Sequence, residues 1–432
     1  MARKMKDSGI EWIGEIPEGW RTINPKALFT QRKDKAQKGE RQLTSSQQYG
    51  ILYQDDYMEL TGSKVVTVEK DFDILKHVEA GDFVISMRSF QGGLEYSTNS
   101  GAISSAYVML VPNLELVYPR FYRWLLKSSV YIDALQRTTN MVRDGQAMRY
   151  SNFAQVRLFT LPLDEQKSRA DFLDLECSSI DKILFKTRSS IEEYKKLKQA
   201  VITQAVTKGV RGEREMKDSG VEWIGEIPKK WNRCKLNSIC TFINGDRSKN
   251  YPSSEDFQDI GIPFIGADSL NGFFVDTYSA RHISPAKYAS MGGLKITQGD
   301  ILYTLRGSTI GKNAIANFND GTIASSLVGI RVKSPFLASS SFLFYWLNSL
   351  NEFVQRDLCI NGSTAPNLSA ENVAQFFIYI PDITEQHEIA DYLDAKCAEI
   401  DKLIAKKEQL VKELDSYKKS LIYEVVTGKR EV

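Results

Sequence analysis

Six basic or glycine-rich loops of this sequence carry side chains that suit contact with nucleic acid. Arginine, glutamine, asparagine and serine can read the edges of bases, whereas lysine and backbone N–H groups hold phosphates. Three of the loops lie in each half of the chain, and for any loop taken alone a solvated turn is the alternative. The candidate contact residues are Arg32, Lys33, Arg88, Ser89, Gln91, Arg143, Gln146, Arg149, Arg247, Ser248, Lys249, Arg306, Ser308, Thr309, Lys312, Asn361, Ser363 and Thr364.

Arg306 is the strongest single candidate among these residues. It follows the apolar run ILYTL and precedes a glycine, so we expect its side chain to be presented where a strand opens into a turn. Three roles remain open for it: a bidentate contact to guanine, a phosphate contact, or an ion pair with a carboxylate of its own domain.

The motifs of nucleotide and cofactor sites are missing from the chain. No G-x-G-x-x-G occurs, and the run from Gly307 to Lys312 has one residue too few for a P-loop and is followed by Asn313. The twelve prolines include no adjacent pair, which an amino-methyltransferase motif would need. The three histidines lie far apart. We therefore expect no catalytic residue, no metal site and no cofactor in this chain.

Composition indicates an ordinary multidomain protein. At 432 residues the chain is long enough for more than one core, with 42% apolar and 25% charged residues. Five scattered cysteines do not form a disulfide framework, and no apolar run is long enough to span a membrane. These features predict a cytoplasmic protein with no membrane partner. The net charge of +2 does not by itself predict DNA binding, so that prediction rests on the local loops.

The positions of these loops follow from a duplication. The segment Met5–Trp20 returns as Met216–Trp231 with three substitutions. We expect its tryptophans and proline to anchor each globular domain; a docking surface for other subunits is the alternative. The residues concerned are Trp12, Pro17 and Trp20, with Trp223, Pro228 and Trp231 in the second copy.

A second repeated segment predicts two long helices. Residues 165–207 and 385–427 carry apolar positions at alternating spacings of three and four, which is the heptad pattern of a coiled coil. Polar residues interrupt both patterns at matching places, Thr187 with Lys407 and Lys198 with Lys418. The predicted seam consists of Leu173, Cys177, Ile180, Leu184, Ile191, Tyr194 and Val201, and of Leu393, Cys397, Ile400, Ile404, Val411, Leu414 and Leu421.

The globular inserts carry period-two apolar runs and resemble each other weakly. GDFVISMRS at 81–89 matches GDILYTLRG at 299–307, for example. The predicted class is α+β, with two mixed, strand-rich domains that are each followed by a long helix. We place the first domain with its anchor at 1–160, the first helix at 161–210, the second domain at 211–379 and the second helix at 380–432.

The chain resembles the specificity subunit of type I restriction–modification enzymes. The repeated M-K-D-S-G-[IV]-E-W-I-G-E-I-P-x-x-W, the tails LPLDEQ and IPDITEQ, and the ending VTGKREV carry the resemblance. It implies two target-recognition domains that each bind half of an interrupted double-stranded DNA site. The helices would form an antiparallel coiled-coil spacer with pseudo-two-fold symmetry. Two adenine methyltransferase subunits and two motor–nuclease subunits would join this chain and carry S-adenosylmethionine, ATP and Mg²⁺.

Two other functions remain open on the residues alone. One is a coiled-coil scaffold whose domains bind only proteins. The other is an enzyme of unknown chemistry on a duplicated fold. Binding to random duplex DNA distinguishes the scaffold from a DNA-specificity subunit, and a cluster of catalytic groups would indicate the enzyme.

Overall fold

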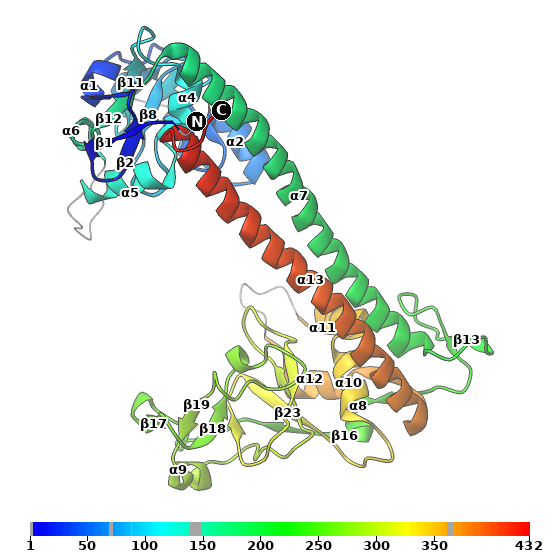
Figure 1. The fold of residues 1–432 in the computed structure, drawn as a ribbon. Helices are drawn as coiled ribbons and strands as arrows, with labels where there is room; N and C mark the ends of the chain where they lie inside the picture. The colour runs from blue at the N-terminus through cyan, green and yellow to red at the C-terminus, as the bar shows by residue number, and fades with distance from the viewer. Residues whose placement is uncertain (1–2, 69–71, 88, 139–147, 361–366) are drawn as a thin grey trace. The chain divides into compact units, whose positions relative to one another are not determined.

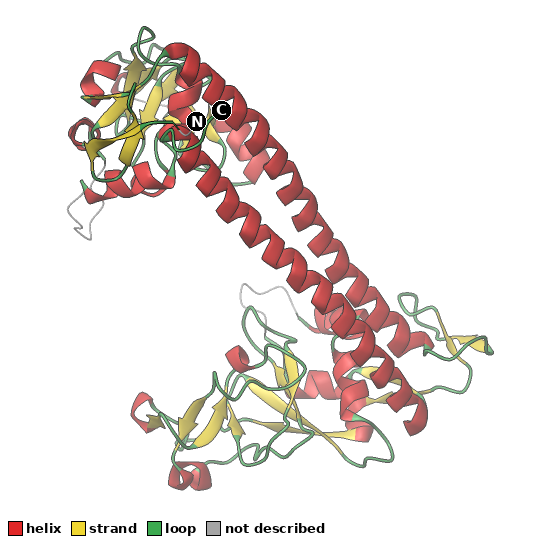
Figure 2. Ribbon diagram, in the orientation of Figure 1, coloured by secondary structure: helices red, strands yellow, loops and turns green. Residues whose placement is uncertain are grey.

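The computed structural model describes residues 3–68, 72–87, 89–138, 148–360 and 367–432. The chain divides into two compact units, unit 1 with residues 1–188 and 409–432 and unit 2 with residues 189–408. Both units combine helices with mainly antiparallel sheets (Figure 2), so the predicted α+β class is confirmed. No helix in the described ranges is long and apolar enough to cross a membrane.

Unit 1 is built on a four-stranded antiparallel sheet with the order β4-β11-β8-β9. The inner strands are apolar and buried, as strands covered on both faces should be. Short two-stranded ribbons pair β1 with β2, β3 with β12, β5 with β6 and β7 with β10. The strands are β1 Met5–Ile10, β2 Gly14–Pro17, β3 Arg21–Ile23, β4 Phe29–Arg32, β5 Leu43–Ser46, β6 Gly50–Tyr53, β7 Lys76–Val78, β8 Phe83–Ile85, β9 Glu95–Tyr96, β10 Gly101–Ile103, β11 Val108–Pro112 and β12 Leu158–Thr160.

The core of unit 1 is aromatic and continues into the long helices. The ring of Phe29 meets Phe83 and Phe153 edge to face, with centroids 5.3 and 5.7 Å apart. Trp20 and Leu173 belong to the same buried cluster. The helices of this unit are α1 Pro25–Leu28, α2 Gln54–Thr61, α3 Ser89–Gly92, α4 Pro119–Leu125, α5 Ser129–Arg137 and α6 Tyr150–Gln155, together with the start of α7 Leu163–Lys208 and the end of α13 Ile383–Val426.

Unit 2 repeats the four-stranded sheet in the order β16-β23-β20-β21, and adds a second sheet, β17-β19-β18-β22, in which β18 and β22 are parallel. The strands are β13 Met216–Asp218, β14 Glu226–Pro228, β15 Asn232–Lys235, β16 Cys240–Asn244, β17 Phe257–Gln258, β18 Ile262–Ile265, β19 Arg281–Ile283, β20 Ile301–Thr304, β21 Asn313–Ile315, β22 Thr322–Ile323, β23 Leu327–Val332 and β24 Phe377–Ile380. The shorter helices are α8 Leu236–Ile239, α9 Pro285–Ser290, α10 Ser340–Leu347, α11 Leu350–Cys359 and α12 Ala370–Gln375.

The two long helices, α7 and α13, contribute to both units (Figure 1, green and red). Within each unit their contacts run in opposite directions along the two segments. In unit 1 the pairs are Lys418 with Asp181 and Asp415 with Arg188. In unit 2 they are Tyr194 with Lys407, a cation–π contact of 5.6 Å, and Lys198 with Asp401. The segments of α7 and α13 are therefore antiparallel within each unit.

The predicted seam residues differ in burial along these helices. Several of them, including Leu173, Cys177, Leu393 and Cys397, belong to the buried clusters of the globular domains. Buried residues are Leu173, Cys177, Ile180, Leu184, Ile191, Leu393, Cys397, Ile400 and Leu421. Half-buried residues are Tyr194, Val201, Ile404, Val411 and Leu414.

The repeated Glu-Gln pair near the start of each long helix joins the helix to its domain. Gln166 is fully buried, accepts a hydrogen bond from the Tyr118 N–H at 2.7 Å and donates to the carbonyl groups of Leu116 and Leu161. Gln386 makes the same three bonds in unit 2, with Ser339, Leu337 and Pro381. Each side chain thus satisfies loop and helix-end groups that would otherwise be buried without partners.

Candidate nucleic-acid interface

Strand direction brings two of the predicted loops of unit 1, those after β4 and β8, together at one end of its sheet. Both β4 and β8 run antiparallel to β11, so the loops that leave β4 and β8 lie beside the loop that enters β11. The register places Arg32 opposite Met109 and Ile85 opposite Val108. We call this end the loop end of the sheet.

Unit 2 has the same arrangement at the loop end of its own four-stranded sheet. Asn244 at the end of β16 pairs with Val328, and Thr304 at the end of β20 pairs with Leu327. The loops 245–256 and 305–312, which carry seven of the candidate side chains, therefore start from the two strands that flank β23. Arg306 also bridges through its backbone to Asn367, which brings residues near the predicted 361–367 loop to the same end.

Arg306 is exposed at the start of loop 305–312. The loop closes through two backbone hydrogen bonds, from Gly311 N–H to the Thr304 carbonyl and from Thr304 N–H to the Lys312 carbonyl, both 2.9 Å. Within the described ranges the Arg306 guanidinium forms no ion pair and no side-chain hydrogen bond. The third role considered for Arg306, an ion pair with a carboxylate of its own domain, is therefore absent from the described residues.

The other candidates in this loop divide into exposed and engaged side chains. Ser308 and Thr309 are exposed at its tip, next to Gly307, whose φ of 84° suits glycine. Lys312 instead turns back into the domain, where its ammonium group contacts the Ala267 carbonyl at 3.1 Å and Asn271 Oδ1 at 2.7 Å. Lys312 thus supports the loop, and its role at DNA stays a prediction.

Loop 245–256 presents two cations at the same end of the sheet as loop 305–312. Arg247 and Lys249 are exposed, and the Arg247 guanidinium donates a long hydrogen bond of 3.4 Å to the Ser325 carbonyl. The turn is held by Asp246, whose carboxylate accepts hydrogen bonds from the N–H groups of Ser248 and Gly292. Burial of Asp246 opposes ionisation, but these bonds outweigh it and lower its pKa, so the anchor stays charged at neutral pH.

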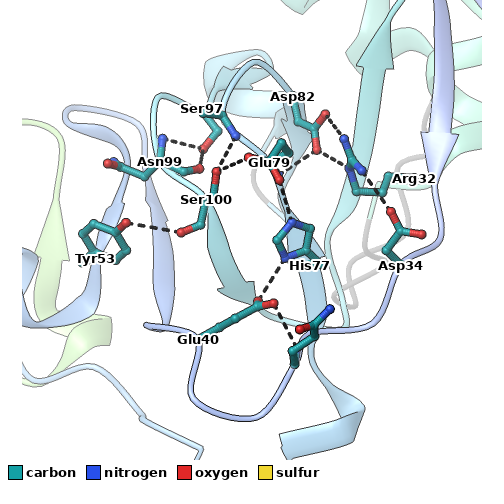
Figure 3. A network of polar contacts seen from close by, with 12 residues as sticks. Arg32, Asp34, Glu40, Tyr53, His77, Glu79, Asp82, Ser97, Asn99 and Ser100 are labelled. Carbon is teal, nitrogen blue, oxygen red and sulfur yellow. Dashed lines mark hydrogen bonds and ion pairs between the residues drawn. The ribbon is translucent and has the colours of Figure 1, made fainter.

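In unit 1 the basic loop that follows β4 is tied down by a polar network (Figure 3). Arg32 holds Asp82 through Nε and Nη2 at 2.6 and 3.0 Å and holds Asp34 through Nη1 at 2.9 Å. His77 lies between Glu40 and Glu79, with 3.0 Å contacts on each ring nitrogen. Arg32 would have to leave two carboxylates to contact DNA, whereas Lys33 beside it is exposed.

The remaining candidates of unit 1 also differ in exposure. Ser89 is buried at the start of α3, and its hydroxyl accepts a hydrogen bond from the Ser86 N–H at 2.9 Å. Gln91 on α3 and Arg149 before α6 are exposed. Their contact with DNA stays a prediction. Six candidates lie outside the described residues: Arg88, Arg143, Gln146, Asn361, Ser363 and Thr364.

One arginine of the second domain was missing from the sequence-based set because its role is internal. Asp300 and Asp82 occupy matching places, and each carboxylate caps a turn by accepting an N–H, from Thr297 and Glu79. Asp82 is neutralised by Arg32 on β4, whereas Asp300 is neutralised by Arg331 on β23, with both contacts 2.7 Å. The same buried carboxylate is thus balanced from different strands, from β4 beyond β11 in unit 1 and from β23 next to β20 in unit 2.

Other reactive side chains are buried among apolar groups. Burial raises the pKa of the Cys177 and Cys397 thiols to about 11, so both are neutral thiols near pH 7. In the described ranges no group of three or more histidine, cysteine, aspartate or glutamate side chains could hold a metal ion. The exposed candidates Lys33, Gln91, Arg247, Lys249 and Arg306 instead follow strands at the loop ends, where they can contact a polyanion.

Comparison with known proteins agrees with this geometry. Residues 228–413 match the family described as the type I restriction modification DNA specificity domain. Across 97% of its length the chain is 23% identical to the putative type I restriction enzyme MjaX specificity subunit of Methanocaldococcus jannaschii, of which it covers 96%. This chain is similar to the specificity subunits of type I restriction enzymes.

Other similar proteins match over a similar or smaller share of the length of this chain. The MjaVIII specificity subunit of the same organism is 24% identical over 82% of this chain and 80% of its own length. The specificity (HsdS) subunit from Thermoanaerobacter tengcongensis has a similar fold, with a TM-score of 0.52 and 16% identity over 96% of this chain and 98% of that one. A chain from a study of complex assembly and conformational transition of the type I R-M system gives a TM-score of 0.68, with 15% identity over 96% and 99%.

Proposed function

We propose that this chain acts as a specificity subunit and binds an interrupted, two-part sequence in double-stranded DNA, with the loop end of each unit contacting one half-site. The chain itself would be non-catalytic. It would supply sequence recognition to a DNA adenine methyltransferase and restriction complex, in defence against foreign DNA such as that of phages.

The observation that carries the proposal is a repeated scaffold with different loops. Both units present a four-stranded sheet of the same strand order, and both gather exposed polar loops at the corresponding end. The side chains there differ between the copies, with Lys33 and Gln91 in one and Arg247 and Arg306 in the other. A common scaffold with changed contact residues suits two different sequences of one kind of ligand.

Reciprocal ion pairs support a pseudo-two-fold relation between the copies. Lys198 and Lys418 occupy matching seam positions, and Asp181 and Asp401 occupy matching positions directly after seam residues. Lys198 binds Asp401, and Lys418 binds Asp181. Such an exchange is expected of an antiparallel coiled coil of two equivalent helices. We infer that the helices space two recognition domains along one duplex, with unread base pairs between the half-sites.

Methyltransferase and motor–nuclease subunits are the proposed protein partners, two of each. Matching surfaces repeated in the two copies would scaffold two copies of the same partner. S-adenosylmethionine, ATP and Mg²⁺ would belong to those partners, because this sequence lacks the motifs that bind them. The fold likeness to a chain from a type I assembly supports this proposal.

Selection from a random duplex library tests the proposal. The full chain, purified with its methyltransferase subunits, should enrich one motif with two defined parts and an undefined spacer of fixed length. A motif with a single continuous part would contradict the two-part proposal. Stable complex formation with the partner subunits but no enriched sequence would instead support the alternative of a protein-binding scaffold.

A further inference from the structure

A buried polar chain in unit 2 connects the central sheet to the loop that carries Arg306. Tyr303 on β20 is fully buried, and its hydroxyl donates a hydrogen bond to Oε1 of Glu352 on α11. The same carboxylate oxygen accepts a hydrogen bond from Arg356 Nε, one turn further along α11, at 2.9 Å. The side chains of Glu352 and Arg356 are only 3% and 15% exposed. Removing both charges from water is costly, so the presence of this buried pair calls for a structural or functional explanation.

Arg356 also contacts the underside of loop 305–312. A Cβ atom placed on Gly311 would lie 2.8 Å from Arg356 Nε and 2.9 Å from Cζ, closer than side-chain atoms normally approach. Glu352 restrains the guanidinium on its other side. Gly311 therefore rests directly on a charged group that cannot withdraw without losing its counter-ion.

The first domain uses different chemistry at the same places. Ile85, Tyr131 and Leu135 occupy the positions of Tyr303, Glu352 and Arg356, and all three are fully buried. There α3, which follows β8, packs against α5. In the described residues the segment after β8 packs on α5 and the loop after β20 packs on α11, and the second contact is made through a buried ion pair.

We propose that Tyr303, Glu352 and Arg356 are positioning residues for sequence recognition: they hold loop 305–312 in one conformation, so that Arg306 meets its half-site in one orientation. This inference rests on the proposed function of the chain. The Arg356 guanidinium suits this role because a planar group held by hydrogen bonds fixes the orientation of the loop above it. Apolar packing restrains orientation more weakly. Small displacements at such a site change discrimination strongly, since bidentate base contacts demand accurate geometry.

Two glycine variants separate the contact with Arg356 from backbone strain. Gly311 and Gly307 lie in the same loop with φ of 88° and 84°, so alanine is equally disfavoured at both. A Cβ at Gly307 meets nothing within 4 Å, whereas a Cβ at Gly311 meets Arg356. Gly307→Ala is therefore the matched control for Gly311→Ala.

A third variant removes the Glu352–Arg356 ion pair without leaving a single buried charge. Glu352→Gln with Arg356→Met keeps similar volumes and deletes both charges, a change that is often neutral for stability. Thermal unfolding verifies that each variant is folded. If Arg356 acts through Gly311, adding Gly311→Ala to this double variant should cause no further loss of discrimination, because the group it would meet is gone.

The full chain with its methyltransferase subunits is assayed by random-duplex selection. Gly311→Ala and the double variant should lose discrimination in one half of the motif, by about tenfold for the affected base pair. The other half should be unchanged, and Gly307→Ala should lose much less. An intact motif with Gly311→Ala, equal losses with Gly307→Ala, or loss in both halves would each overturn the inference. If the wild-type protein itself enriches no motif, the proposed function fails first.

Discussion

The indole nitrogen of Trp20 donates a hydrogen bond to Oε2 of Glu165 across 3.1 Å, which ties the first repeated segment to the start of α7. Trp231 and Glu385 repeat the bond in unit 2 at 3.3 Å. Burial opposes ionisation of Glu165, but hydrogen bonds from Arg3, Arg169 and Trp20 outweigh it and lower its pKa to about 2. The repeated segment therefore anchors a domain to a helix in each unit.

Replacing Glu165 with alanine should reduce the free energy of unfolding by roughly 3 kcal/mol, because Arg169 would stay buried without its counter-ion. Urea unfolding followed by circular dichroism measures the change. Glu11→Ala removes an exposed ion pair with Arg137 and should cost no more than about 0.5 kcal/mol. Similar losses in the two variants would show that Glu165 is not a structural anchor.

A charge introduced at the seam residue Leu184 of α7 should lower stability much more than a charge introduced at its neighbour Ile183. Leu184 is 4% exposed, whereas its neighbour Ile183 is 47% exposed. Leu184→Asp should destabilise unit 1 by more than about 2 kcal/mol, since a carboxylate would be buried without a partner. Ile183→Asp should stay within about 0.5 kcal/mol. The comparison uses thermal unfolding of the two variants, and indistinguishable curves would argue against the seam.

Removing the Arg306 side chain should reveal which kind of contact it makes. If it binds guanine, Arg306→Ala should cost roughly 1–3 kcal/mol and relax one position of one half-site. If it binds phosphate, affinity should fall equally for all duplexes, and the slope of log affinity against log salt concentration should shrink by about one. Lys406→Ala removes an exposed charge from α13 as a control. Unchanged affinity and salt slope for a folded Arg306→Ala protein would exclude Arg306 from the interface.

His77 should make the basic loop of unit 1 sensitive to pH. Burial opposes protonation of His77, but Glu40 and Glu79 outweigh it, so its pKa is raised above 6.5. A raised pKa in the folded state means that this stabilisation is complete below about pH 6.5 and is lost as pH rises through the folded pKa. NMR titration of the imidazole should give a pKa above 6.5 in the wild type and return towards 6.5 in Glu40→Gln. A wild-type pKa at or below 6.5 would refute the assignment.

The isolated chain should bind no S-adenosylmethionine and hydrolyse no ATP. The physical reason is that it lacks the glycine-rich loops that hold such phosphates and cofactors. Calorimetric titration and a phosphate-release assay test this, with the chain bound to its partner subunits as the positive control. Saturable binding of either ligand at micromolar concentration by the chain alone would contradict the prediction.

Local patterns were sufficient to predict the long helices. The heptad spacing indicated helices at 165–207 and 385–427, and the structure has them at Leu163–Lys208 and Ile383–Val426. The strand before Arg306 was likewise visible as an apolar run, which is followed by Arg306 and a glycine. These features depend on neighbouring residues, so periodicity and turn chemistry are enough to find them.

The pairing of distant side chains could not be predicted in this way. Arg32 belongs to a basic run that looks free, yet its partner Asp82 lies fifty residues further along the chain. Glu352 and Arg356 show a helical spacing of four, but nothing local indicates that they would be buried beneath Gly311. Such contacts depend on how strands and helices from separate parts of the sequence are brought together.

The different origin of the arginine that neutralises each turn aspartate constrains how recognition loops can be exchanged by protein engineering. In the first domain Arg32 precedes Asp82 in the chain, whereas in the second Arg331 follows Asp300. A graft that begins after β4 would carry Asp82 into a host without Arg32. A graft that ends before β23 would carry Asp300 without Arg331. Transplanted segments should therefore run from β4 through β11, or from β16 through β23, so that each buried carboxylate travels with its own cation.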